Sequence, residues 1–106
     1  MALHEVCRLD ELFEGRGRTV RLAALPDRYL AVFLVDGEVR CIDNECPHVG
    51  SPLARGSVVD GRVTCSSHGW VFDLETGALC TVFGEMSGVR TYRTEIRDGS
   101  VYVDLR

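Results

Sequence analysis

The sequence predicts an all-β domain, and two observations support that prediction. Three Asp-Gly pairs, at residues 36–37, 60–61 and 98–99, each separate two runs rich in β-branched and aromatic residues. Asp-Gly between such runs is a strong hairpin signal, because both residues tolerate positive φ. Only one segment, LDELFEG at residues 9–15, is suited to a helical turn, and it is short. We therefore expect antiparallel hairpins packed as a sandwich or a small barrel.

The expected strands follow the Asp-Gly pairs along the chain. A loosely alternating segment comes first, and each Asp-Gly pair then joins two further strands. In the last strand, apolar residues at 101, 103 and 105 alternate with polar ones, which is the period of a half-buried strand. The expected strands are residues 18–23, 30–35, 38–43, 57–59, 62–65, 91–97 and 100–105.

Size and composition are those of one ordinary domain, which we expect to span residues 1–106. The length of 106 residues is too short for a separate catalytic domain beside a cofactor domain. Hydrophobic residues at 45% and charged residues at 26% are typical of a globular protein and argue against disorder. The formal net charge of −4 makes the chain a poor candidate for nucleic-acid binding.

Five cysteines in so short a chain are unusual, and an odd number excludes complete pairing in internal disulfides. Charged residues near the start predict that no signal peptide is present. The longest apolar run, residues 29–35, is far shorter than the ~20 residues of a membrane span. We therefore expect a soluble cytoplasmic protein with no membrane partner. Cys7, Cys41 and Cys80 are expected to be small buried hydrophobic residues.

Two turn-rich segments each pair a cysteine with a histidine. The first, about residues 44–56, contains Cys46 and His48, and the second, about residues 65–72, contains Cys65 and His68. Thiolate and imidazole both bind iron, zinc and copper. A Cys₂His₂ zinc site is possible, although zinc sites usually group cysteine with cysteine and histidine with histidine. The mixed pairs favour a binuclear iron–sulfur cluster, with the cysteines on one iron and the histidines on the other.

The arrangement closely resembles the signature of the Rieske [2Fe–2S] family, in which C-x-H is followed by C-x-x-H. The number of residues between the two motifs is similar here and in the family. The flanking stretches DNECPHVGSPLARG and CSSHGWVFDLETG are similar too, and the likeness extends from roughly Leu22 to Leu105. It implies an antiparallel β-sandwich whose two loops form a cluster-binding subdomain at one end. It also implies one [2Fe–2S] cluster, bound by Cys46, His48, Cys65 and His68.

Four positions differ from the high-potential members of that family. Ser51 and Ser67 stand where those members carry two cysteines joined in a disulfide. Trp70 and Phe72 stand where they carry a serine and a tyrosine whose hydroxyls hydrogen-bond the cluster region. Fewer hydrogen bonds to sulfur stabilise the reduced cluster less. The resemblance therefore implies a low-potential protein, near about −150 mV.

Three functions follow from these observations. The first is a soluble Rieske-type ferredoxin that carries single electrons from a flavin-dependent reductase to a terminal oxygenase or similar acceptor, as an electron-transfer component rather than a catalyst. The second is the small subunit of an assimilatory NAD(P)H nitrite reductase, which the stretches IDNECPH and HGWVFDLETG resemble. The third is a zinc-stabilised interaction module. We favour the carrier over the subunit, because many such subunits lack the cluster ligands and this chain has all four.

Overall fold

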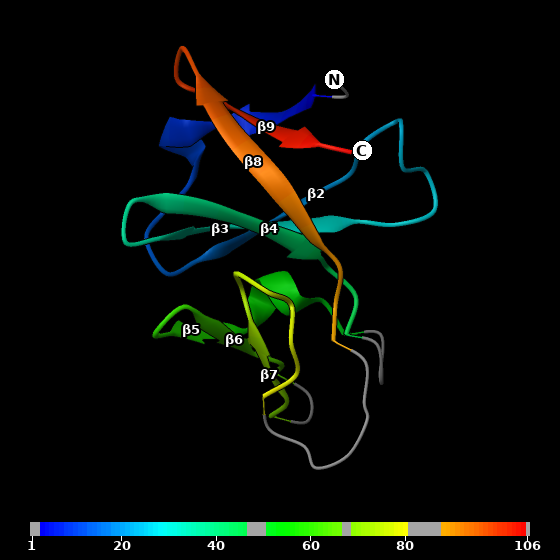
Figure 1. The fold of residues 1–106 in the computed structure, drawn as a ribbon, viewed down its shortest axis with the longest axis vertical. Coiled ribbons are helices and arrows are strands. Elements are labelled where there is room, and N and C mark those ends of the chain that lie inside the picture. Colours follow the sequence, from blue (N-terminus) through cyan, green and yellow to red (C-terminus); the bar gives the residue numbers. More distant parts are fainter. Residues whose placement is uncertain (1–2, 47–50, 67–68, 81–87, 106) are drawn as a thin grey trace.

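The computed structural model describes residues 3–46, 51–66, 69–80 and 88–105. Within them the chain forms a larger antiparallel sheet in the order β1-β9-β8-β4-β3-β2 and a smaller one in the order β5-β6-β7 (Figure 1). The antiparallel all-β prediction is confirmed. The larger sheet contains β1 (Leu3–Arg8), β2 (Gly17–Val20), β3 (Leu30–Val35), β4 (Glu38–Asp43), β8 (Thr91–Arg97) and β9 (Ser100–Asp104). The smaller sheet contains β5 (Ser57–Val59), β6 (Arg62–Thr64) and β7 (Val71–Asp73), and the 3₁₀ turns are η1 (Leu9–Glu11) and η2 (Leu53–Arg55).

All three Asp-Gly pairs form the predicted hairpin turns. Asp36, Asp60 and Asp98 have φ values of 51°, 52° and 50°, and the glycine after each also has positive φ. These turns join β3 to β4, β5 to β6 and β8 to β9. Two central residues with positive φ match the twist of the paired strands, so the turns set the strand registers locally.

Three elements differ from the sequence-based expectation. β1 was not expected, and it pairs with β9 from the other end of the chain. The strand expected at residues 18–23 ends at Val20, because a turn follows in which Leu25 N donates to Leu22 O at 3.0 Å. The second loop is shorter than predicted, since Val71 and Phe72 begin β7.

β3 separates two hydrophobic cores, because its side chains alternate between its two faces. Leu30 and Val32 pack into one core with residues from β1, β4 and β9. Ala31 and Phe33 pack into the other, which includes η2, β6 and β7. All four are fully buried, which explains why β3 is an unbroken apolar run. The second core therefore attaches the smaller sheet to the larger one.

In the described residues, no helix is long and apolar enough to cross a membrane.

Gly17 lies where β2 approaches η2 too closely for a side chain. A Cβ at this position would lie 2.5 Å from Ala54 O and 2.7 Å from the Phe33 ring. We expect Gly17→Ala to destabilise the protein by about 1–3 kcal/mol, the usual cost of overpacking. Urea denaturation measures this, and Thr19→Ala, an exposed position on the same strand, is the control. Equal stability of the two variants would contradict the close approach.

Candidate metal centre

The structure describes two of the four predicted ligands, Cys46 and Cys65. Each follows a strand, β4 or β6, each is 1% exposed, and neither is in a disulfide. Both belong to the core that also contains Phe72 and Leu53. The fold thus brings together two cysteines that are far apart in the sequence. His48 and His68 lie outside the described residues.

Asn44 holds the two ends of the first loop together. Its backbone oxygen accepts from Leu53 N at 2.6 Å, and its side-chain Oδ1 accepts from Ala54 N at 2.9 Å. Inside this closure, Cys46 N donates to Ser51 O at 2.9 Å. Asn44 is 7% exposed, so its hydrogen bonds are shielded from water. The position of Cys46 is therefore set by a closed hydrogen-bonded loop.

The second loop is a tight reversal beginning at Cys65. Cys65 N donates to Trp70 O at 2.7 Å, and Gly69 N donates to Cys65 O at 3.0 Å. Gly69 has a φ of +71°, a conformation that a glycine adopts without strain. Trp70 packs against the buried cluster that contains Cys65. The position of Cys65 is thus fixed by backbone hydrogen bonds and by the packing of the Trp70 ring against the core.

The described residues fit one iron of a [2Fe–2S] cluster. Two buried thiols on separate loops, surrounded by apolar side chains, are a suitable donor pair for iron. The apolar surroundings exclude water, which contributes to the redox properties of such a site. Among the described residues, no group of three or more His, Cys, Asp or Glu side chains could hold a metal ion.

Phe72 is fully buried in the hydrophobic core that contains Cys46 and Cys65, and its side chain has no hydroxyl group. The resemblance described above makes this position a source of hydrogen bonds to the cluster in high-potential proteins. Its burial here means that a phenylalanine places only hydrocarbon near Cys46 and Cys65. The low reduction potential stays a prediction.

The three other cysteines divide into two kinds. Cys7 and Cys41 are buried as predicted, and burial raises the pKa of both thiols. The prediction that Cys80 is buried was wrong, because its side chain is exposed. Its backbone pairs with β7, where Cys80 N donates to Val71 O at 2.8 Å. Pairing at the end of this small sheet leaves the side chain at the surface.

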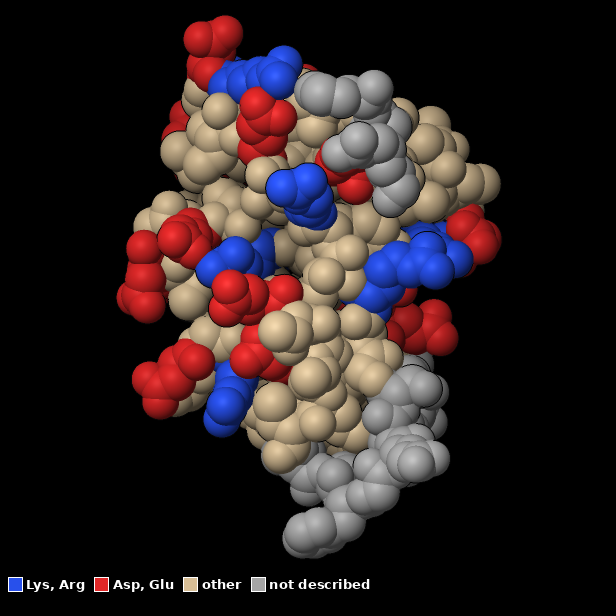
Figure 2. Space-filling model, viewed as in Figure 1, with Lys and Arg blue, Asp and Glu red and all other residues tan. Residues whose placement is uncertain are grey.

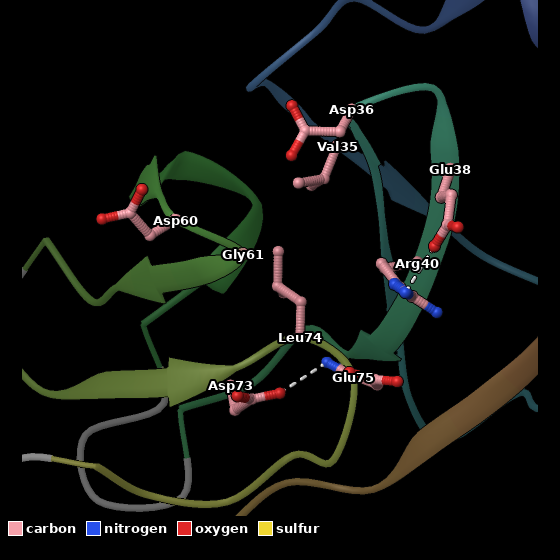
Figure 3. Close-up of a pocket in the computed structure, with 9 residues that line it drawn as sticks. All are labelled: Val35, Asp36, Glu38, Arg40, Asp60, Gly61, Asp73, Leu74 and Glu75. Carbon is pink, nitrogen blue, oxygen red and sulfur yellow. Dashed lines mark hydrogen bonds and ion pairs between the residues drawn. The ribbon is translucent and has the colours of Figure 1, made fainter.

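Sequence reasoning missed an acidic groove between the β3–β4 hairpin and the smaller sheet (Figure 3). It has a volume of about 320 Å³ and is lined by residues that include five carboxylates and one arginine. The arginine, Arg40, pairs with Glu38. Backbone hydrogen bonds from Thr76 and Glu75 to Asp73 Oδ1 lower the pKa of Asp73. Two Asp-Gly turns contribute carboxylates to this groove, a signal that was visible in the sequence. The lining residues are Val35, Asp36, Glu38, Arg40, Asp60, Gly61, Asp73, Leu74 and Glu75.

Removing the Asn44 side chain tests the closure of the first loop. We expect Asn44→Ala to cost about 1–3 kcal/mol, because the buried N–H of Ala54 loses its acceptor. We also expect faster cluster loss in the presence of an iron chelator, followed by visible absorption. Glu45→Ala changes an exposed neighbour and is the control. If Asn44→Ala and the control lose the cluster at the same rate, Asn44 does not hold the loop.

A family profile decides the classification. The profile of the Rieske [2Fe–2S] domain matches residues 2–93. The chain belongs to the Rieske [2Fe–2S] family. A Rieske-type [2Fe–2S] cluster is therefore its cofactor, and the preference for an iron–sulfur cluster over zinc is confirmed.

Two curated Rieske relatives differ greatly in length. The ferredoxin subunit of 3-phenylpropionate/cinnamic acid dioxygenase from Photorhabdus laumondii is 34% identical, and the match covers 94% of this chain and 91% of the relative. Human apoptosis-inducing factor 3 is also 34% identical over 92% of this chain. The chain spans only 16% of that second protein. The relatives thus include a protein of about the length of this chain as well as a much longer one.

Solved structures confirm the predicted Rieske fold. The ferredoxin of Sphingomonas yanoikuyae B1 has a TM-score of 0.86 and 32% identity, covering 97% of this chain and 98% of that one. A structure described as an NADH-dependent nitrite reductase small subunit, from Mycobacterium tuberculosis, has a TM-score of 0.85 and 26% identity, covering 96% and 93%. Both predicted classes of electron-transfer protein are therefore represented among the structural neighbours.

Proposed function

We propose that this chain is a Rieske-type ferredoxin that carries single electrons from a flavin-dependent reductase to a terminal oxygenase or similar acceptor. The observation that supports it best is the match over 91% of a dioxygenase ferredoxin subunit. A second ferredoxin component, of the p-cumate 2,3-dioxygenase system of Pseudomonas putida, is 31% identical over 94% of this chain. In this role the chain has no substrate of its own.

We assign the cluster ligands as Cys46 and Cys65 on one iron and His48 and His68 on the other. The bound cluster would accept and release one electron without making or breaking a bond in a substrate. The chain's own part is to position the ligands and to exclude water. Burial of both cysteines and the hydrogen-bonded loops around them support this division.

We place the protein in the cytoplasm. All five cysteines lie in the described part of the chain and none of them is in a disulfide, including Cys7 and Cys41, which lie in the same core. A reducing compartment keeps cysteines in that state.

A nitrite reductase small subunit is the second candidate, and the structural likeness to such a subunit favours it. The carrier remains the better proposal, because all four ligand residues are present at the family spacing. The two functions predict different partners: a small flavoprotein and an oxygenase for the carrier, and a large sirohaem enzyme for the subunit.

Rapid mixing of the cluster-loaded protein with NADH and a purified flavoprotein reductase from a dioxygenase system tests the proposal. We expect the visible absorption of the oxidised cluster to bleach, and mixing with the oxygenase of that system to restore it. The metal-free protein is the control, because any absorption change that it gives on mixing with the reductase does not come from the cluster. Absence of cluster reduction, together with stable co-purification with a sirohaem nitrite reductase, would favour the subunit instead.

A further inference from the structure

A network of polar side chains lies at the end of β4, three residues before Cys46. Tyr92 Oη, from β8, donates to Asp43 Oδ1 at 2.6 Å. Arg28 Nη1 lies 3.7 Å from Asp43 Oδ2 and 3.5 Å from Tyr92 Oη. The backbone of Asp43 joins in, since its N–H donates to Arg90 O at 3.0 Å. Three segments that are distant in the sequence therefore meet at Asp43.

The network is only partly open to solvent. The side chains of Arg28 and Asp43 are 34% and 25% exposed, and Asp27, which also lies 3.6 Å from Arg28, is 72% exposed. Partly buried charges are screened by salt less than exposed ones. The hydrogen bond to Tyr92 and the charge of Asp43 raise the pKa of Arg28, while burial raises the pKa of Tyr92. The network thus places a guanidinium and a hydroxyl donor against the same side chain, that of Asp43.

The next residue connects this network to the first loop. Asn44 N donates to Tyr29 O at 3.0 Å, so residues 28–29 contact residues 43–44 through both side chains and backbone. Asn44 also closes the loop that contains Cys46, as described above. The direction in which the chain enters the loop is therefore fixed by Arg28, Asp43 and Tyr92 together with this backbone bond.

We propose that Asp43, Tyr92 and Arg28 are positioning residues that orient the first loop, and that the charges of Asp43 and Arg28 shift the reduction potential of the cluster. This inference rests on the proposed assignment of Cys46 as a ligand. A carboxylate favours the more positive, oxidised cluster, and a guanidinium favours the reduced one. Loss of the Asp43 charge should raise the potential, and loss of the Arg28 charge should lower it. A network that only held the loop in place would not shift the reduction potential in opposite directions in these two variants.

Redox titration of four cluster-loaded proteins at pH 7 tests this proposal: wild type, Asp43→Asn, Arg28→Gln and the double variant. We expect a higher potential for Asp43→Asn, a lower one for Arg28→Gln, and a value close to wild type for the double variant. The matched controls are the single variants Glu95→Gln and Arg97→Gln. These two residues form an ion pair on β8, the strand that contains Tyr92, and their side chains are 43% and 51% exposed. We expect the control potentials to equal that of wild type.

Tyr92→Phe separates positioning from charge, because it removes the hydrogen bond to Asp43 and keeps the aromatic ring. We expect this variant to lose its cluster several-fold faster than wild type when a chelator is added. Unchanged potentials in both single variants, or shifts of the same sign, would overturn the proposal. A cluster retained after loss of Cys46 or Cys65 would instead overturn the ligand assignment, so the two failures are distinguishable.

Discussion

We expect Cys65→Ala to abolish cluster binding, so that the purified protein is colourless and contains no stoichiometric iron. Cys65 is buried and shares with Cys46 the core that contains Phe72. Because ligation contributes to the folding free energy of such sites, the loss should also lower the melting temperature of the protein. Iron and sulfide analysis, visible absorption and thermal unfolding measure the three effects.

Cys80→Ala is the matched control for this experiment, because it removes an exposed thiol of the same type. We expect it to retain full colour and iron content. A Cys65→Ala protein with the iron content and the electron paramagnetic resonance spectrum of wild type would contradict the ligand assignment.

Phe72→Tyr has the second large expected effect, on the reduction potential. We expect the wild-type potential to lie near about −150 mV, at the low end of the Rieske range. A hydroxyl introduced at this fully buried position would supply the hydrogen bond that the high-potential relatives have and this chain lacks. A hydrogen bond to a charged group is worth about 1.5–3 kcal/mol, and about 1.4 kcal/mol corresponds to 59 mV for one electron. Only the part of this energy that favours the reduced cluster over the oxidised one shifts the potential, which should therefore rise by up to about 130 mV.

Phe13→Tyr is the control for Phe72→Tyr, because it introduces the same hydroxyl at a side chain that is 64% exposed. Its potential should equal that of wild type. A wild-type potential above about +100 mV would mean that the low-potential interpretation is wrong. Equal potentials for wild type and Phe72→Tyr would show that this position does not tune the cluster.

Local turn chemistry made much of the fold predictable. Each Asp-Gly pair determines its own hairpin, so the strands on either side were found from the sequence. β1 was missed because its partner is β9, and no local signal near residue 3 indicates a partner near residue 104. Pairing between the two ends of a chain depends on the assembled core rather than on neighbouring residues.

The same distinction applies to the candidate site. Cys46 and Cys65 were found from the spacing of their motifs, and the structure brings both into one buried cluster. The network at Asp43 could not be found in this way, because its partners Tyr92 and Arg28 come from other strands and loops. Tyr92 is 49 residues from Asp43 and 64 from Arg28. Contacts between residues so far apart in the sequence can be inferred only once the order of the strands in the sheet is known.

Pulsed electron paramagnetic resonance of the reduced protein, with its histidines labelled with ¹⁵N, tests whether two histidines bind the cluster. We expect couplings from two histidine nitrogens bound to the cluster, and their loss, with the cluster, in His48→Ala and His68→Ala. His4→Ala, which changes the remaining histidine, should retain both couplings. A reduced cluster whose spectrum contains no histidine nitrogen coupling would contradict the assignment of two cysteine and two histidine ligands.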